Sequence, residues 1–183
     1  MTTAWNELVN ISKHLHGRVL DAGCSNGDYT NFLFAMPKVD DVVSLDIQDI
    51  NTPHHGKSFA ETVPGGVFIQ GDVQDLPFED DSFDCILSWD MLQNVKDAPK
   101  AFREFARVTK RGGFVTVRTT IKELTPWVKS GVTVEKGSSG YTFVQYMRDQ
   151  DELHIMGFEA GLHTIDYHVD PWSHQTFLFE VRK

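Results

Sequence analysis

The sequence predicts an α/β protein with a doubly wound, mostly parallel seven-stranded sheet and an antiparallel last strand, as a single domain over residues 1–183. Strand and helix patterns alternate along most of the chain, which is typical of crossover connections between parallel strands. The strand patterns are near-continuous, β-branched apolar runs, as a sheet covered on both faces requires. The last two strand patterns are joined by residues 170–173, which are too few for a crossover helix, so these two strands should pair antiparallel.

The first half of the chain is organised around a glycine-rich turn between a strand and a helix. The N-terminal segment has apolar residues at loose helical spacing, and the helix after the turn should end before Pro37, because proline cannot continue a helix. Short β-branched runs mark the strands. The expected elements are a helix over 3–16, a strand over 18–21, a helix over 29–34, and strands over 42–47 and 66–70.

The second half continues the alternation and then changes to antiparallel pairing. A turn over 79–82 precedes a strand, and a helix with one apolar face follows it. Lys110-Arg111-Gly112-Gly113 should end that helix, because cations and glycine favour a helix C-terminus. The expected elements are a strand over 83–88, a helix over 98–109, a strand over 114–118, a helix over 149–161, and strands over 163–169 and 176–181.

One stretch does not follow the alternation. Two β-rich runs, 132–135 and 141–146, flank the turn-forming segment Lys136-Gly137-Ser138-Ser139-Gly140. This pattern predicts a small β-hairpin. The hairpin lies within residues 119–147, which begin directly after the expected fifth strand, at the edge of the sheet where a ligand should bind. Because the segment is rich in aromatic residues, we expect it to be a substrate lid, with an edge hairpin that extends the sheet as the alternative.

Composition and charge exclude several classes of protein. The chain has 17 basic and 26 acidic residues, for a net charge of −9, so an acidic surface should repel nucleic acid. No apolar run is long enough to span a membrane, and the N-terminus lacks the basic and apolar blocks of a signal peptide. Two cysteines, without a Cys-x-x-Cys pair, suggest neither a disulfide framework nor zinc. We therefore expect a cytoplasmic protein with reduced thiols, no bound metal and no membrane partner.

The glycine-rich turn is the most informative segment. A buried strand ends at Asp21, a turn containing Gly23 and Gly27 follows, and a helix begins. Glycines at such a turn let the backbone approach a ligand closely. A tight strand-to-helix turn without a ligand is the simpler alternative. A nicotinamide-dependent dehydrogenase is less consistent with the spacing, because that class needs Gly-x-Gly-x-x-Gly.

Two further acidic residues follow strands. Asp46 ends the second strand, where an acid can accept hydrogen bonds from two ribose hydroxyls. Asp72 follows the third strand, where a carboxylate can accept a hydrogen bond from an adenine amine. The alternatives are a solvated strand-end acid at Asp46 and a turn-capping role for Asp72 or Asp75.

Five segments of the chain form an ordered set of motifs. They are Asp21-Ala22-Gly23-Cys24-Ser25-Asn26-Gly27, Gly71-Asp72-Val73-Gln74-Asp75-Leu76-Pro77-Phe78, Phe83-Asp84-Cys85-Ile86-Leu87-Ser88, Phe105-Ala106-Arg107-Val108-Thr109-Lys110-Arg111-Gly112-Gly113 and Gly157-Phe158. In this order they resemble the class I S-adenosylmethionine-dependent methyltransferases, and specifically the type 11-like group. The resemblance covers nearly the whole chain. Ser25 replaces the middle glycine of the family's loop, and Arg111 replaces its usual proline.

The resemblance implies a Rossmann-like methyltransferase fold, S-adenosyl-L-methionine as the cofactor and a role for each matching residue. Asp21 and the Gly23 backbone would hold the methionine end, Asp46 the ribose diol and Asp72 the adenine amine. Ile47 would pack on the adenine, the Val73 amide would meet a ring nitrogen, and the Ser88 carbonyl would face the cofactor's amino group. The implied cofactor-binding residues are Asp21, Gly23, Cys24, Gly27, Asp46, Ile47, Asp72, Val73 and Ser88.

Substrate-binding residues should follow the fourth and fifth strands and line the insert, because ligands bind outside the carboxyl ends of parallel strands. The Asn/Asp-Pro-Pro-aromatic tetrad of base methyltransferases is missing after strand four. No Pro-Cys pair is present for cytosine-carbon methylation, and Cys85 is expected to be a buried structural thiol. His174 is a weak catalytic candidate in the loop between the last strands. The substrate-binding candidates are Trp89, Asp90, Asn94, Arg118, Trp127 and Tyr146.

These features favour a methyltransferase that acts on a small-molecule acceptor by in-line methyl transfer. One alternative is a methyltransferase for a protein or carrier-bound substrate. Another is a non-catalytic scaffold that kept the cofactor-binding fold, which the complete set of Asp21, Gly23, Gly27, Asp46 and Asp72 disfavours.

Overall fold

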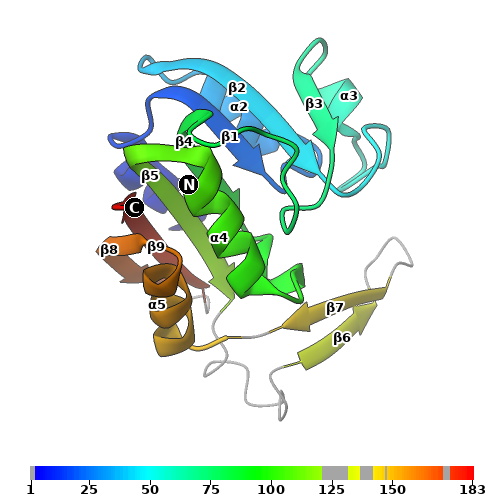
Figure 1. The fold of residues 1–183 in the computed structure, drawn as a ribbon. Coiled ribbons are helices and arrows are strands. Elements are labelled where there is room, and N and C mark those ends of the chain that lie inside the picture. Colours follow the sequence, from blue (N-terminus) through cyan, green and yellow to red (C-terminus); the bar gives the residue numbers. More distant parts are fainter. Residues whose placement is uncertain (1–2, 121–131, 137–141, 147, 171–173) are drawn as a thin grey trace.

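A computed structural model describes residues 3–120, 132–136, 142–146, 148–170 and 174–183. Its main sheet has seven strands in the order β3-β2-β1-β4-β5-β9-β8 (Figure 1). β1 to β5 are parallel to one another, whereas β9 runs antiparallel to both of its neighbours, β5 and β8. The predicted doubly wound sheet with an antiparallel last strand is therefore confirmed.

The elements follow the predicted alternation. The strands of the main sheet are β1 Gly17–Ala22, β2 Val39–Asp46, β3 Val67–Gln70, β4 Phe83–Trp89, β5 Thr109–Thr120, β8 Leu162–Val169 and β9 His174–Val181. The helices are α1 Thr3–Ser12, α2 Asp28–Phe34, α3 Phe59–Thr62, α4 Ala98–Val108 and α5 Gln150–Glu159, with a short 3₁₀ helix η1 at Leu92–Asn94. No helix among the described residues is both long and apolar enough to cross a membrane.

An apolar core forms on each face of the main sheet because side chains alternate between the two faces of each strand. Leu20 and Ile86 point to the face covered by α4 and α5, where they join Phe102 and Phe105 in one buried cluster. Val19 and Cys85 point to the other face, where they pack with apolar residues of α1 and α2. Figure 1 shows α4 and α5 in front of the sheet, with the strands behind them. Cys85 is a buried free thiol, as expected.

Some element boundaries differ from the sequence prediction. The N-terminal helix ends at Ser12 rather than at residue 16. The predicted helix-ending segment Lys110-Arg111-Gly112-Gly113 instead belongs to a strand, because α4 ends at Val108 and β5 begins at Thr109. His174 was expected in a loop but is the first residue of β9. The helix α3 was not predicted, although Ser58 and Glu61 form a capping box at its start.

The expected hairpin forms a separate two-stranded sheet. β6 Val132–Lys136 pairs antiparallel with β7 Thr142–Tyr146. Figure 1 shows this hairpin extending away from the main sheet, and β7 lies against η1. Trp127, a substrate-binding candidate, lies outside the described residues, as does the glycine-serine turn.

Candidate active site

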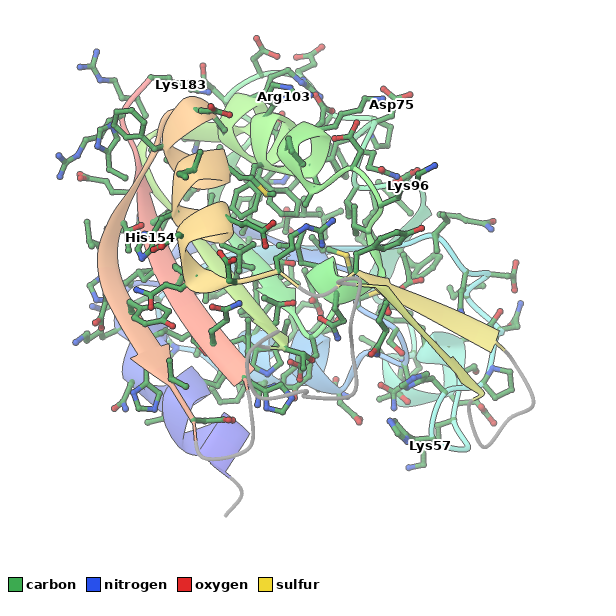
Figure 2. All side chains as sticks on the ribbon, turned by 90° about the horizontal axis from the view of Figure 1, so that it is seen from below. Lys57, Asp75, Lys96, Arg103, His154 and Lys183 are labelled. Carbon is green, nitrogen blue, oxygen red and sulfur yellow. The ribbon has the colours of Figure 1, made fainter. Side chains whose placement is uncertain are left out.

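A cavity of about 560 Å³ lies at the carboxyl ends of the parallel strands. Figure 2 shows this end of the molecule, seen from below. The label Lys57 marks the loop after β2, and the label Lys96 marks the segment after η1. Both segments border the cavity. The lining residues come from the ends of β2 and β4, the start of α2, and the segments after β1, β2, β3 and β4. They are Gly23, Cys24, Ser25, Asn26, Asp28, Tyr29, Leu45, Asp46, Ile47, Gln48, His54, His55, Gly71, Asp72, Val73, Gln74, Trp89, Asp90, Met91, Asn94 and Val95.

The glycine-rich turn is tied to the end of β2 by backbone hydrogen bonds. The amides of Gly23 and Cys24 donate to the carbonyl of Leu45 at 2.7 and 3.1 Å. The Ser25 amide donates to Asp46 Oδ2 at 2.9 Å. Gly23 has a φ of 82°, a left-handed conformation that favours glycine, so this position tolerates other residues poorly. The turn thus places its backbone on the wall of the cavity.

Asp46 and Ile47 form the next part of the wall. Asp46 Oδ1 accepts a hydrogen bond from the Gln48 amide at 2.9 Å, which fixes the carboxylate together with the bond from Ser25. Each carboxylate oxygen keeps further acceptor capacity for a ligand. The Ile47 side chain is 66 % exposed although it is apolar, and it borders the cavity. An exposed apolar side chain beside an anchored carboxylate suits a ligand that has both a flat apolar part and hydroxyl groups.

Asp72 and Val73 lie on the cavity after β3. The Asp72 carboxylate accepts hydrogen bonds from the amide and the side chain of Gln74 at 2.9 to 3.0 Å, while Val73 is buried beside it. The turn-capping alternative is thus observed for Asp72. It does not exclude ligand binding, because both residues line the cavity as well.

Three predicted cofactor-binding residues lie behind this wall rather than on it. Gly27 caps α2 with a φ of 84° and faces Phe59 and Val63. Ser88 is buried within β4. Asp21 is buried and accepts a 2.6 Å hydrogen bond from Thr30 Oγ1.

Burial strongly changes the acidity of Asp21. Loss of hydration raises the pKa of its carboxyl to about 7, the nearby charge of Asp46 adds to this increase, and the Thr30 hydrogen bond opposes it. Because Asp21 is not among the lining residues, its observed contacts support a structural role beneath the glycine-rich turn.

The end of β4 and the segment after it form another side of the cavity. Trp89, Asp90 and Asn94, three of the substrate-binding candidates, line it. Arg118 does not line it; the side chain is buried and forms ion pairs with Asp90 and Asp170. Tyr146 is also not among the lining residues. It is half-buried on β7, and its carbonyl accepts a hydrogen bond from Arg148.

His174 lies behind the cavity rather than in it. Its backbone amide donates to Asp170 Oδ1 at 2.9 Å, and its Nδ1 is 3.2 Å from Asp170 Oδ2. Asp170 in turn binds Arg118. The structure therefore connects His174 to Asp90 through two intervening side chains, without bringing it to the cavity.

Several lining residues were missed by sequence reasoning. Tyr29 lies in the first turn of α2, directly after the glycine-rich loop, and this position was the signal that could have identified it. Met91 follows Asp90 after β4 in the same way. His54 and His55 belong to the loop after β2, where no periodic pattern marks the residues that face a ligand. Burial lowers the pKa of His54, and the adjacent His55 contributes to this decrease.

Arg148 was also missed, and it connects the insert to the cavity wall. Its buried guanidinium donates to the carbonyls of Leu92, Val95, Lys96 and Tyr146 at 2.7 to 3.2 Å. These carbonyls belong to η1, the residues after it and the end of β7. Arg148 thus holds the segment that carries Asn94 and the hairpin in one arrangement.

A second cavity, of about 140 Å³, lies between α1 and the β8–β9 edge of the sheet. It is lined by Asn10, Ile11, Asp166, Tyr167, His168, Thr176 and Leu178. Its volume is below the range of about 300–1,000 Å³ that is usual for small-molecule sites, whereas the larger cavity lies within this range. The strand-end cavity is therefore the candidate active site.

Comparisons with known proteins identify the family of the chain. The family model Methyltransf_11, described as a methyltransferase domain, matches residues 20–117, which is more than half of the chain. A demethylmenaquinone methyltransferase of Staphylococcus aureus is 34 % identical over 113 residues, which cover 61 % of this chain and 46 % of that protein. The chain thus spans about half the length of the curated relatives it matches.

Solved structures with the same fold cover nearly the whole chain. An S-adenosylmethionine-dependent methyltransferase from Mesorhizobium loti has a TM-score of 0.76 at 15 % identity, with 98 % of both chains covered. The PH0226 protein from Pyrococcus horikoshii has a TM-score of 0.75 at 18 % identity and covers 100 % of this chain and 92 % of that one. The fold, the ordered motifs and the family match together show that the chain belongs to the class I S-adenosylmethionine-dependent methyltransferases.

Proposed function

We propose that this protein transfers a methyl group from S-adenosylmethionine to a small-molecule acceptor in the strand-end cavity. The observation that carries the proposal is the convergence of Asp46, Asp72 and the Gly23 backbone on one cavity of about 560 Å³. Their donor and acceptor chemistry fits the cofactor, since carboxylates at the ends of β2 and β3 suit a ribose diol and an adenine amine.

The chain's own residues would bind and orient the cofactor. Asp46 would accept hydrogen bonds from the ribose, Asp72 from the adenine amine, and Ile47 and Val73 would pack against the base. When bound, the cofactor supplies an electrophilic methyl group on a sulfonium. The protein then has to align the acceptor and exclude water, which the segment after β4 and the Arg148-anchored hairpin can do.

A small-molecule acceptor is supported by the size of the cavity and by the charge of the protein. The related Staphylococcus aureus protein is named for a small-molecule substrate. A net charge of −9 disfavours the phosphate backbone of a nucleic acid. We also propose a cytoplasmic location, consistent with Cys24 and Cys85 as buried free thiols. A protein or carrier-bound acceptor is the alternative, and it predicts turnover only when that partner is present.

The insert 119–147 completes this proposal as a lid over the acceptor. Its β6–β7 hairpin lies against η1, whose last residue, Asn94, borders the cavity. The hairpin is therefore placed to influence how an acceptor enters the cavity. The carboxylates proposed to bind the cofactor, Asp46 and Asp72, lie outside the hairpin.

Calorimetric titration with S-adenosylhomocysteine, the demethylated cofactor, tests the proposal first. We expect saturable one-to-one binding to the wild-type chain and to Asp40→Asn, an exposed control far from the cavity lining. A screen of small hydroxyl, amine and thiol acceptors then measures release of the demethylated cofactor. Absence of cofactor binding would refute the enzymatic proposal, whereas binding without turnover of any acceptor would favour the scaffold alternative.

A further inference from the structure

Asp90 has an unusual place at the end of β4. Its φ of 55° is left-handed, which is uncommon for residues other than glycine. Its amide donates to the Arg118 carbonyl at 3.0 Å, and its carbonyl accepts a hydrogen bond from Gln93 Nε2 at 2.6 Å. The backbone is thus held on both sides in this conformation, and Asp90 lines the cavity.

A buried charge network lies directly behind Asp90. Arg118 pairs with the Asp90 carboxylate and, through its other terminal nitrogen, with Asp170 Oδ2 at 2.9 Å. The Arg118 guanidinium also lies over the Trp89 ring, 5.4 Å from the centroid. The Arg118 side chain is 4 % exposed and that of Asp170 is 0 % exposed, whereas the Asp90 side chain is 35 % exposed. Of these three charged groups, Asp90 is the one on the cavity wall.

The groups facing Asp90 come from three parts of the fold. Tyr29 approaches from α2, Arg118 from β5, and Asp170 and His174 from the β8–β9 end. Burial raises the pKa of the Asp90 carboxyl, and Asp170 adds to this effect. The positive charge of Arg118, and of His174 when it is protonated, opposes it. A carboxylate with a raised pKa is a better proton acceptor than an ordinary aspartate.

The walls beside Asp90 are aromatic. Tyr29 and Trp89 both line the cavity, and their rings lie 5.8 Å apart at an angle of 49°. Tyr29 is half-buried and Trp89 is 4 % exposed, so Tyr29 offers the larger accessible part of this wall. Met91 adds a polarisable thioether to the same wall. A planar aromatic ring is the shape that suits such a surface, and a hydroxyl group on it suits the adjacent carboxylate.

We propose that Asp90 is the catalytic residue that binds the hydroxyl of an aromatic acceptor and takes its proton, with Arg118, Asp170 and His174 as positioning residues. This inference rests on the proposed methyltransferase function and names the substrate class of the same site. In the reaction the acceptor's O–H bond breaks and its proton moves to an Asp90 carboxylate oxygen. The freed oxygen electron pair forms the bond to the methyl carbon, and the pair of the broken carbon–sulfur bond stays on sulfur.

A matched pair of probes tests the binding part. The wild-type chain saturated with S-adenosylhomocysteine is titrated with 2-naphthol and with 2-methoxynaphthalene, which has the same ring but cannot donate a hydrogen bond. We expect 2-naphthol to bind about tenfold more tightly than 2-methoxynaphthalene, because one hydrogen bond to a charged group increases the binding affinity by about this factor. Asp90→Asn keeps the backbone conformation, since asparagine tolerates a left-handed φ, and should reduce the preference to about threefold or less. Asp40→Asn should behave as wild type.

Turnover gives the second readout. With S-adenosylmethionine and 2-naphthol, kcat should fall by about 100-fold in Asp90→Asn, the usual size of general-base catalysis. The wild-type rate should decrease as the pH falls through the pKa of Asp90, and this acid limb should disappear in the variant. His174→Gln should keep the probe preference but move the acid limb to higher pH, because a protonated imidazole there favours the ionised carboxylate.

The outcomes separate this inference from the function on which it rests. If S-adenosylhomocysteine does not bind, the proposed function fails and the role of Asp90 fails with it. If it binds but the two naphthalene probes bind equally, only the role of Asp90 is overturned. Preferred methylation of 1-naphthylamine over 2-naphthol overturns the hydroxyl class, and an unmoved acid limb in His174→Gln overturns the positioning role of His174.

Discussion

Asp21 should make the stability of this protein depend strongly on pH. Its carboxyl is buried at 2 % exposure, and burial raises its pKa to about 7 from an ordinary value of 3.8. A group whose folded pKa is raised stabilises the fold fully below the unfolded pKa, and this contribution is lost as the pH rises through the folded pKa. Asparagine has nearly the same shape and carries no charge at any pH, and it can still accept the Thr30 hydrogen bond. We therefore predict that Asp21→Asn becomes progressively more stable, relative to wild type, as the pH rises.

The magnitude follows from the two pKa values. With 3.8 unfolded and about 7 folded, the wild type loses about 2.5 kcal/mol of unfolding free energy between pH 5 and pH 8 through Asp21 alone. Other titrating groups are common to both proteins, so they cancel when the two stabilities are subtracted. The free energy gained by Asp21→Asn over wild type should thus be about 2.5 kcal/mol larger at pH 8 than at pH 5.

Urea unfolding followed by circular dichroism at several pH values between these limits measures the difference. Asp40→Asn is the control, because Asp40 is exposed and its removal should shift the stability by a small amount at every pH. Stability profiles of wild type and Asp21→Asn that run parallel from pH 5 to pH 8 would refute the reasoning, since they would mean that Asp21 is ionised in the folded protein throughout.

Four further outcomes are expected. Asp46→Ala should weaken S-adenosylhomocysteine binding by at least tenfold in calorimetry, because charge-assisted hydrogen bonds contribute about 1.5–3 kcal/mol each; unchanged affinity in a folded variant contradicts the ribose role. Gly23→Ala should cost about 1–2 kcal/mol in urea unfolding, since a Cβ at its φ of 82° would lie 2.2 Å from Met91 Cγ, and a neutral result would show that the turn adapts. Arg148→Ala should cost about 3 kcal/mol by the same assay by leaving four carbonyls without their donor, while Arg148→Lys should recover only part of it. Replacing 132–146 by a short glycine-serine linker should leave cofactor affinity nearly intact and abolish turnover; surviving turnover would place the acceptor pocket elsewhere.

The sheet, and the meeting of Asp46 and Asp72 at one cavity, could be predicted because both follow from regular patterns. Parallel strands end at one edge, so Asp46 and Asp72 had to lie near each other once their strands were recognised. The pleating of strands explains why it was harder to predict which side chains face the cavity. Successive side chains of a strand point to opposite faces, and an error of one position moves a residue from the cavity to the core.

Asp21 and Arg118 show this limit. Both stand next to segments that form the cavity, yet Asp21 is buried beneath the glycine-rich turn and Arg118 is enclosed by Asp90 and Asp170. Asp170 lies 52 residues from Arg118 along the chain, and no local pattern reports such a contact. His54 and His55 belong to a loop, whose side-chain directions depend on tertiary contacts rather than on a repeat.

The strand order of the sheet also determines how the protein can be assembled during synthesis. β9 lies between β5 and β8, so within the described sheet β8 has no hydrogen-bonding neighbour except β9. When β8 leaves the ribosome, it cannot yet join the sheet, because β9, the strand that separates it from β5, has not been made. α5 packs on β8, so the final position of α5 also depends on the pairing of β8 with β9. Among the strands of the described sheet, β9 is made last and therefore closes it. Before β9 is made, β5 and β8 expose unpaired edges, and such edges are prone to aggregation.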